Sequence, residues 1–193
     1  MNLQEHKNSS AMMVWLSTDE LKQLVDCPDD VQRQLALKLG GYCGLRSAEV
    51  VNVKPAHVRD TQIGKVLEVP AGKGDKYRET PIPDGLAGQI RTIGQYEGED
   101  TTVVGTESTR TLRRWINTAA NELAEQTENN RWEFLSFHDL RRTWATLLAS
   151  ADVDPMVAIE WGGWDDLQTF LDHYQGKYSP EARKRERNKV RWL

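Results

Sequence analysis

Five residues of this 193-residue chain have types and positions that suit chemistry on a phosphate. Arg46 stands near a predicted helix start, where the helix dipole disfavours a cation unless an anion lies close by. Lys73 lies between two glycines in a predicted turn, from which a long basic side chain would project. His138 and Arg141 share one face of a predicted helix, and Tyr174 follows them. Together they offer cations for phosphate oxygens, a proton carrier and a hydroxyl nucleophile.

Each of these features also has an ordinary explanation. Arg46 could pair with Glu49 on the surface, and the H-x-x-R segment could be a capped helix with a solvated arginine. Lysine is common in hairpin turns, and a tyrosine such as Tyr174 is usually a half-buried surface aromatic. No single motif is specific, so the interpretation depends on all of them occurring together.

The elements that would position these residues are mostly helices. Capping residues and apolar spacing predict helices at about 18–26, from Asp29 or Asp30 to Gly40-Gly41, and at about 46–52, 84–95, 108–126, 138–150, 154–162 and 166–174, with a basic helix from about Ser179. Val66–Val69 and Glu79–Ile82 flank a glycine-rich turn, which predicts a β-hairpin. The expected fold class is therefore mainly α with a small antiparallel β-sheet (α+β).

Three segments are expected along the chain. Residues 1–17 form a flexible N-terminal arm, residues 18–178 form the main domain, and residues 179–193 form a basic C-terminal helix or tail. The tail ends in Trp192-Leu193, an apolar tip on a polar stalk. This tip could fold back on its own core, or it could enter a pocket of a neighbouring subunit, because buried aromatics often anchor interfaces.

The sequence shows no sign of a membrane-spanning or secreted protein. No apolar run approaches the roughly 18 residues that a membrane span needs, and the N-terminus lacks the pattern of a signal peptide. Cys27 and Cys43 have no metal-site spacing, so we expect reduced thiols in a cytoplasmic protein.

The net charge of −4 argues against a nonspecific DNA coat, because phosphate contacts need lysine and arginine. Basic residues are nevertheless clustered. The clusters are Lys73, Lys76 and Arg78; Arg110, Arg113 and Arg114; Arg141 and Arg142; and the tail from Arg183 to Arg191. Of these, Lys76, Arg78 and Arg142 are the expected DNA-binding residues outside the catalytic set.

The order of the motifs resembles the tyrosine recombinase (phage integrase) family. The segments are G-L-R-S-A-E around Arg46, G-K-G around Lys73, H-D-L-R-R-T with His138 and Arg141, then Gly163-Trp164, and finally Tyr174. The resemblance covers about 18–178 and implies the catalytic-domain fold of a DNA breaking-rejoining enzyme. It also implies that Arg46, Lys73, His138, Arg141 and Trp164 are catalytic and that Tyr174 is the nucleophile.

The resemblance implies a specific reaction. Tyr174 would attack a DNA phosphodiester and form a 3′-phosphotyrosyl bond, while two arginines stabilise the charge on the nonbridging oxygens. His138 would take or share the tyrosine proton, and Lys73 would protonate the departing 5′ oxygen. Rejoining would need no cofactor, metal or ATP. The implied role is site-specific recombination for integration or excision of a mobile element, on double-stranded DNA, by a homo-oligomer that is a tetramer in the synapse.

Three departures from the family pattern leave alternatives open. Trp164 occupies a position where many members have histidine, and an indole can donate one hydrogen bond but cannot act as a base. The spacing from Trp164 to Tyr174 is about one residue longer than the resemblance implies, which leaves His173 and Tyr178 as rivals. Full recombinases usually carry an N-terminal helical domain, whereas about 17 residues precede the first predicted helix here, so we expect either an excised domain or a reduced integrase.

Three other classes of function compete with a recombinase. A type IB topoisomerase would use similar chemistry, but the G-L-R-S-A-E segment and the compact size favour the recombinase. A DNA-binding regulator on an inactive integrase scaffold would not need the complete set of catalytic residue types. A plain helical interaction domain would require every motif to be coincidental.

Overall fold

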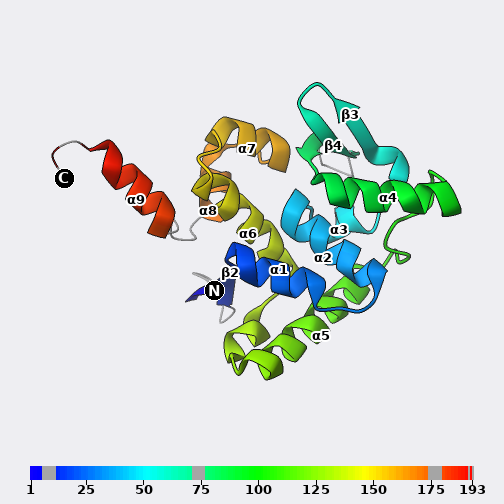
Figure 1. Cartoon of the computed structure of the whole chain (residues 1–193), viewed down its shortest axis with the longest axis horizontal. Coiled ribbons are helices and arrows are strands. Elements are labelled where there is room, and N and C mark those ends of the chain that lie inside the picture. Colours follow the sequence, from blue (N-terminus) through cyan, green and yellow to red (C-terminus); the bar gives the residue numbers. More distant parts are fainter. Residues whose placement is uncertain (6–11, 71–76, 174–179, 191, 193) are drawn as a thin grey trace.

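The computed structural model describes residues 1–5, 12–70, 77–173, 180–190 and 192, and it is mostly helical (Figure 1). The helices are α1 (Thr18–Asp26), α2 (Val31–Cys43), α3 (Ser47–Val50), α4 (Asp84–Glu97), α5 (Thr109–Thr127), α6 (Phe137–Ser150), α7 (Pro155–Gly162), α8 (Leu167–His173) and α9 (Pro180–Lys189), with 3-10 turns η1 (Pro55–His57) and η2 (Asn130–Phe134). The strands are β1 (Asn2–Glu5), β2 (Met12–Trp15), β3 (Val58–Thr61), β4 (Gly64–Val69) and β5 (Arg78–Pro81). No helix among these described residues is long and apolar enough to cross a membrane.

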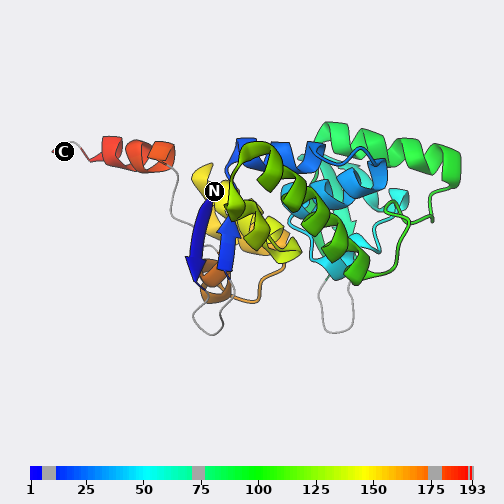
Figure 2. The same ribbon diagram turned by 90° about the horizontal axis from the view of Figure 1, so that it is seen from below.

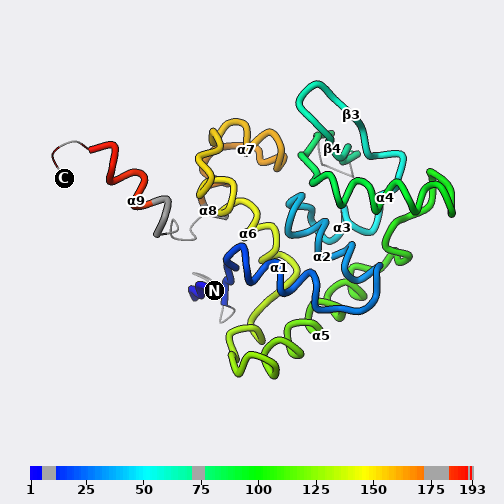
Figure 3. The backbone as a smooth tube through the Cα atoms, viewed as in Figure 1, coloured from blue at the N-terminus to red at the C-terminus, as the bar shows by residue number. Residues whose placement is uncertain are grey.

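Helices α2 and α6 pack against each other in the core, and the smooth trace in Figure 3 shows α1 and α5 lying beside them. The predicted end of α2 at Gly40-Gly41 is wrong, because the helix continues through Cys43 and ends at Gly44 in the left-handed conformation (φ 66°). The two glycines permit close packing instead: a Cβ atom on Gly41 would lie 2.5 Å from Leu21, and one on Gly40 would lie 2.8 Å from Leu140. The chain ends the helix where a positive φ is required.

The predicted hairpin is part of a three-stranded antiparallel sheet of order β3-β4-β5. Strands β4 and β5 pair with Val69 opposite Arg78, and Lys73 lies between these strands in the sequence, outside the described residues. Leu67 and Thr80 are fully buried against the helices, and the Thr80 hydroxyl donates to the Cys43 carbonyl at 3.1 Å. This bond fixes the base of the hairpin to the C-terminal end of α2.

The sequence predicts a flexible arm over residues 1–17, but the described parts of this segment include two paired strands. Strands β1 and β2 pair in an antiparallel ladder, and Val14 is fully buried. The backbone N–H of Val14 donates to Asp139 at 3.2 Å, and that of Leu16 donates to the Thr143 hydroxyl at 3.0 Å. Because a lone pair of strands is marginally stable, this docking onto α6 is what orders the segment.

The remaining elements follow the sequence closely. Helix α1 begins with the predicted capping box, in which Ser17 and Glu20 satisfy each other's backbone N–H groups. Helix α9 projects from the rest of the molecule, as the view in Figure 2 makes clear. Its Arg185 donates to the Ser150 carbonyl at 2.8 Å and pairs with Asp152. Trp192 is 84% exposed, so the alternative in which it packs on its own core is not observed.

Candidate active site

Arg141 is the best-anchored cation of the candidate site. It lies on α6 with only 1% of its surface exposed. Its guanidinium donates to the Gly44 carbonyl at 2.6 Å and to the Gly162 carbonyl at 2.5 Å. Burying a charge is costly unless hydrogen bonds compensate it, so these carbonyls allow Arg141 to remain charged inside the fold. The same two bonds tie α6 to the segment before α3 and to the end of α7.

Arg46 lies in that first segment, two positions after Gly44, at the N-terminal end of α3. Its backbone N–H donates to Glu49 at 2.6 Å, and its guanidinium donates to the other carboxylate oxygen of Glu49 at 3.0 Å. The side chain keeps 35% exposure. Arg46 therefore forms the pair with Glu49 that its ordinary interpretation predicts, but it also presents a partly exposed cation two residues after Gly44, whose carbonyl accepts from the buried Arg141.

Glu49 is the shared anion of this cluster, a role that its place in the sequence does not reveal. Its side chain is 9% exposed and accepts hydrogen bonds from Arg46 and from both terminal nitrogens of Arg78, at 2.6 and 2.8 Å. Burial alone raises the pKa of the Glu49 carboxyl, but the hydrogen bonds and charge of Arg78 outweigh burial and leave the pKa below its usual value. Arg46 and Arg141 contribute to the lowering, so Glu49 is ionised at neutral pH.

In the H-x-x-R segment, His138 is exposed to solvent, whereas Asp139 and Arg141 are buried. His138 is exposed in the first turn of α6, one turn before Arg141. Asp139 is fully buried and accepts from Ser136 and Arg142 as well as from Val14. The aspartate thus caps α6 and holds the N-terminal strand, which fixes the helix that carries His138 and Arg141.

Trp164 packs beneath Arg141. Its ring lies 4.4 Å from the Arg141 guanidinium, stacks on Trp144 with centroids 5.8 Å apart, and meets the edge of Phe170 at 5.0 Å. Only 6% of Trp164 is exposed. The structure places this indole as a packing surface for a cation, and the catalytic role that the resemblance implies for Trp164 stays a prediction.

Several predicted site residues lie outside the part of the chain that the structure describes. These are Lys73, Lys76, Tyr174 and its rival Tyr178. Helix α8 ends at His173, immediately before Tyr174, and β5 begins shortly after Lys76. The roles of these four residues therefore remain predictions.

Two of the residues expected to contact DNA, Arg78 and Arg142, pair with carboxylates inside the protein. Arg78 is 5% exposed, with Glu49 and the Trp161 carbonyl as its partners, so its guanidinium is held inside the fold, and the DNA contact expected at this position stays a prediction. Arg142 has 13% side-chain exposure and pairs with the buried Asp139 at 2.5 Å. In both cases a buried carboxylate pairs with the guanidinium: Asp139 is one helical turn from Arg142, whereas Glu49 lies 29 residues from Arg78 and spacing in the sequence gives no sign of it.

Residues 14–179 match the Phage integrase family, and the chain therefore belongs to this family. Curated relatives include the integrase of Salmonella phage P22 and the tyrosine recombinase XerA of Pyrococcus furiosus, each 26% identical to this chain over 80% of its length. The alignments cover 41% and 54% of those two proteins, so the chain spans about half the length of the curated relatives that it matches.

Solved structures confirm the fold. The XerA recombinase superposes with a TM-score of 0.72 at 21% identity, covering 92% of this chain and 65% of that one. The XerH recombinase bound to its difH substrate gives a TM-score of 0.66 at 19% identity, covering 93% and 54%. The fold is that of a tyrosine recombinase catalytic domain, as the motif order predicts.

A substitution at Gly44 tests how closely the side chains around the candidate site are packed. A Cβ atom there would lie 2.2 Å from the Trp144 ring, and the residue has a positive φ of 66°. We expect Gly44→Ala to lower the free energy of unfolding by about 2–4 kcal/mol, because steric overlap and backbone strain add. Chemical denaturation measures this change. Gly88→Ala is the matched control: it lies inside α4 with open space around it and should be neutral or stabilise by about 0.5–1 kcal/mol. Equal stability of the two variants would contradict the packing described.

Proposed function

We propose that this domain cuts and rejoins double-stranded DNA through a 3′-phosphotyrosyl bond to Tyr174, as a site-specific recombinase that integrates or excises a mobile element. The observation that carries the proposal is the burial of Arg141 between two backbone carbonyls, one of which belongs to Gly44, two residues before the partly exposed Arg46. A cation held in this way is oriented before any substrate arrives, which is what stabilisation of a charged transition state requires.

In the proposed reaction the tyrosine hydroxyl attacks the scissile phosphate, and the bond between phosphorus and the 5′ oxygen breaks. Arg46 and Arg141 would donate to the nonbridging oxygens, which carry the growing negative charge. His138, exposed one turn before Arg141, would accept or share the proton of Tyr174. Lys73 would give a proton to the leaving 5′ oxygen. Reversal of the same steps with a new 5′ hydroxyl rejoins the strand.

Double-stranded DNA at a recombination site is the proposed partner. The related XerH and lambda integrase structures contain bound DNA substrates, and the lambda integrase structure is described as a dimer. We propose that this chain assembles on paired sites as a tetramer, because exchange between two duplexes requires four strand cleavages.

A nicked duplex tests the proposal. A nick close to the cleavage point lets the short released strand diffuse away, so the covalent intermediate accumulates. Incubation with candidate attachment-site duplexes of this design should give a protein–DNA band that survives denaturing electrophoresis. Binding without such a band would instead favour the regulator on an inactive integrase scaffold.

The reaction should not depend on divalent metal. All the charge stabilisation in the proposed mechanism comes from protein cations and not from a bound ion. We therefore expect the yield of covalent adduct in excess EDTA to stay within about twofold of the yield in magnesium, measured on the same nicked duplex. Loss of cleavage in EDTA with recovery on adding magnesium would point to a metal-dependent nuclease instead.

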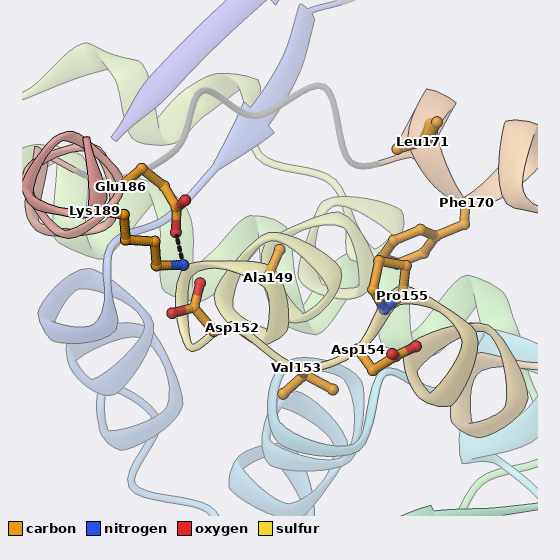
Figure 4. Close-up of a pocket in the computed structure, with 9 residues that line it drawn as sticks. All are labelled: Ala149, Asp152, Val153, Asp154, Pro155, Phe170, Leu171, Glu186 and Lys189. Atoms are coloured by element: carbon orange, nitrogen blue, oxygen red, sulfur yellow. Dashed lines mark hydrogen bonds and ion pairs between the residues drawn. The ribbon is translucent and has the colours of Figure 1, made fainter. Parts of the chain in front are cut away.

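The C-terminal tail should matter for assembly more than for binding. Helix α9 contributes Glu186 and Lys189 to the wall of a hollow of about 610 Å³, whose other side includes Val153, Phe170 and Leu171 (Figure 4). We expect deletion of residues 179–193 to weaken assembly on paired sites at least tenfold, while affinity for one site changes less than threefold. Gel-shift titrations on one-site and two-site DNA measure both quantities. A deletion protein that assembles normally but unfolds at a much lower temperature would show that the tail serves its own fold.

A further inference from the structure

Arg78 has no role in the mechanism above, yet all three nitrogens of its guanidinium donate hydrogen bonds within the protein. It is 5% exposed, and both its terminal nitrogens donate to the Glu49 carboxylate, at 2.6 and 2.8 Å. Its Nε donates to the Trp161 carbonyl at 3.0 Å. The chain around it is shaped to fit: Gly163 has a φ of 63°, and a Cβ atom there would lie 2.7 Å from Arg78 Cδ. Such a paired geometry is specific to arginine, since lysine cannot form it.

The partners of Arg78 belong to the segments that carry the proposed catalytic residues. Glu49 also binds Arg46 at 3.0 Å. Trp161 adjoins Gly162, whose carbonyl accepts from Arg141 at 2.5 Å. Arg78 itself is the first residue of β5, which begins five residues after Lys73 in the sequence. One buried side chain thus connects the hairpin, the Arg46 segment and the end of α7.

The charges in this cluster give Arg78 a second effect. Glu49 accepts from two guanidinium groups, and Arg78 takes both of its oxygens while Arg46 forms one side-chain bond. Arg78 therefore neutralises the carboxylate and leaves the charge of Arg46 available to an anion. Without Arg78, the buried carboxylate would lose the hydrogen bonds that both of its oxygens accept from Arg78, and the Arg46 guanidinium would turn toward it.

We propose that Arg78 is a positioning residue of the strand-transfer site, which holds Glu49 and the Trp161 carbonyl so that Arg46 and Arg141 stay fixed against the scissile phosphate. This inference rests on the proposed function. In this proposal Arg78 does not contact DNA. Its loss changes the positions of Arg46 and Arg141, and it is through these two arginines that the rate of the chemical step falls. A displacement of about 1 Å in a catalytic group can cost on the order of 100-fold in rate.

The test is single-turnover cleavage of the nicked duplex by Arg78→Lys, together with its affinity for the same DNA. Lysine keeps the charge beside Glu49 but cannot hold both partners. We expect the rate constant for adduct formation to fall about 10- to 100-fold, with DNA affinity within about threefold of wild type. A purely structural role would lower the final amount of adduct, through a smaller folded fraction, and leave the rate constant unchanged. Arg91→Lys is the matched control, because Arg91 pairs with Asp60 on the surface and should cleave as wild type.

A second variant covers the case in which Arg78→Lys does not fold. The double variant Arg78→Met with Glu49→Gln removes both charges of the pair and leaves no buried carboxylate. If it folds and cleaves slowly with normal DNA affinity, the proposal stands; if either folded variant cleaves at the wild-type rate, the proposal is overturned. If neither variant folds, Arg78 is a requirement of the fold and the positioning role is also overturned. Absence of adduct with the wild-type chain would instead refute the proposed function itself.

Discussion

Tyr174→Phe is expected to abolish the covalent protein–DNA adduct while DNA affinity stays within about twofold of wild type. The substitution removes only the hydroxyl that would attack the phosphate, so the cations that bind DNA are untouched. Since no other group in the proposed mechanism can form the phosphotyrosyl bond, the loss should exceed about 10⁴-fold. The measurement is denaturing electrophoresis of the nicked duplex after prolonged incubation, with a gel shift for affinity.

Tyr178→Phe is the matched control for this prediction. Tyr178 is the nearest rival nucleophile in the sequence, and the same chemical change at that position should leave the adduct at the wild-type level. If Tyr178→Phe abolishes the adduct and Tyr174→Phe retains it, the match of this segment to the family motif is wrong by four residues. That result would displace the nucleophile without changing the class of reaction.

The second large effect is expected at Arg141. Replacement by lysine keeps a positive charge but cannot donate to the Gly44 and Gly162 carbonyls at once in the planar arrangement of a guanidinium. We expect the rate constant of adduct formation to fall about 10²- to 10³-fold, the usual effect of losing one oriented donor to a transition state. Single-turnover kinetics measure the rate constant.

The same substitution should also lower stability. One of the two carbonyls would lose its partner inside the protein, and an unsatisfied buried acceptor costs about 1–3 kcal/mol. Chemical denaturation of Arg141→Lys beside Arg91→Lys, which changes only an exposed pair, separates this cost from a general effect of replacing arginine. Wild-type cleavage by a folded Arg141→Lys protein would remove Arg141 from the site.

Local signals in the sequence predict most of the helices well. The Ser17–Glu20 capping box defines the start of α1, and the order of the motifs along the chain is enough to predict the fold. These signals succeed because capping and apolar spacing act over a few residues. The pairing of Arg46 with Glu49 is predictable for the same reason, since the two residues are one helical turn apart.

Long-range packing explains what the sequence does not predict. Strand β2 is held in place by hydrogen bonds to Asp139 and Thr143, which lie more than 120 positions further along the chain. In the sequence, Gly40 and Gly41 indicate a helix end. In the structure, Leu140 packs against Gly40 and Leu21 against Gly41, so small residues are needed at both positions. A basic residue near a hairpin turn looks like a DNA contact, and only the position of Glu49 in space shows that Arg78 is buried. In these three cases the partner is distant in sequence.

Mass spectrometry of the covalent adduct tests the central claim most directly. The wild-type chain would be trapped on the nicked duplex and digested with protease and nuclease, and the peptide that carries a nucleotide would be sequenced. The proposed mechanism predicts one modified peptide, with a nucleotide 3′-phosphate on the Tyr174 oxygen. A nucleotide on any other residue, a linkage through the 5′ phosphate, or cleaved DNA with no modified peptide would contradict it.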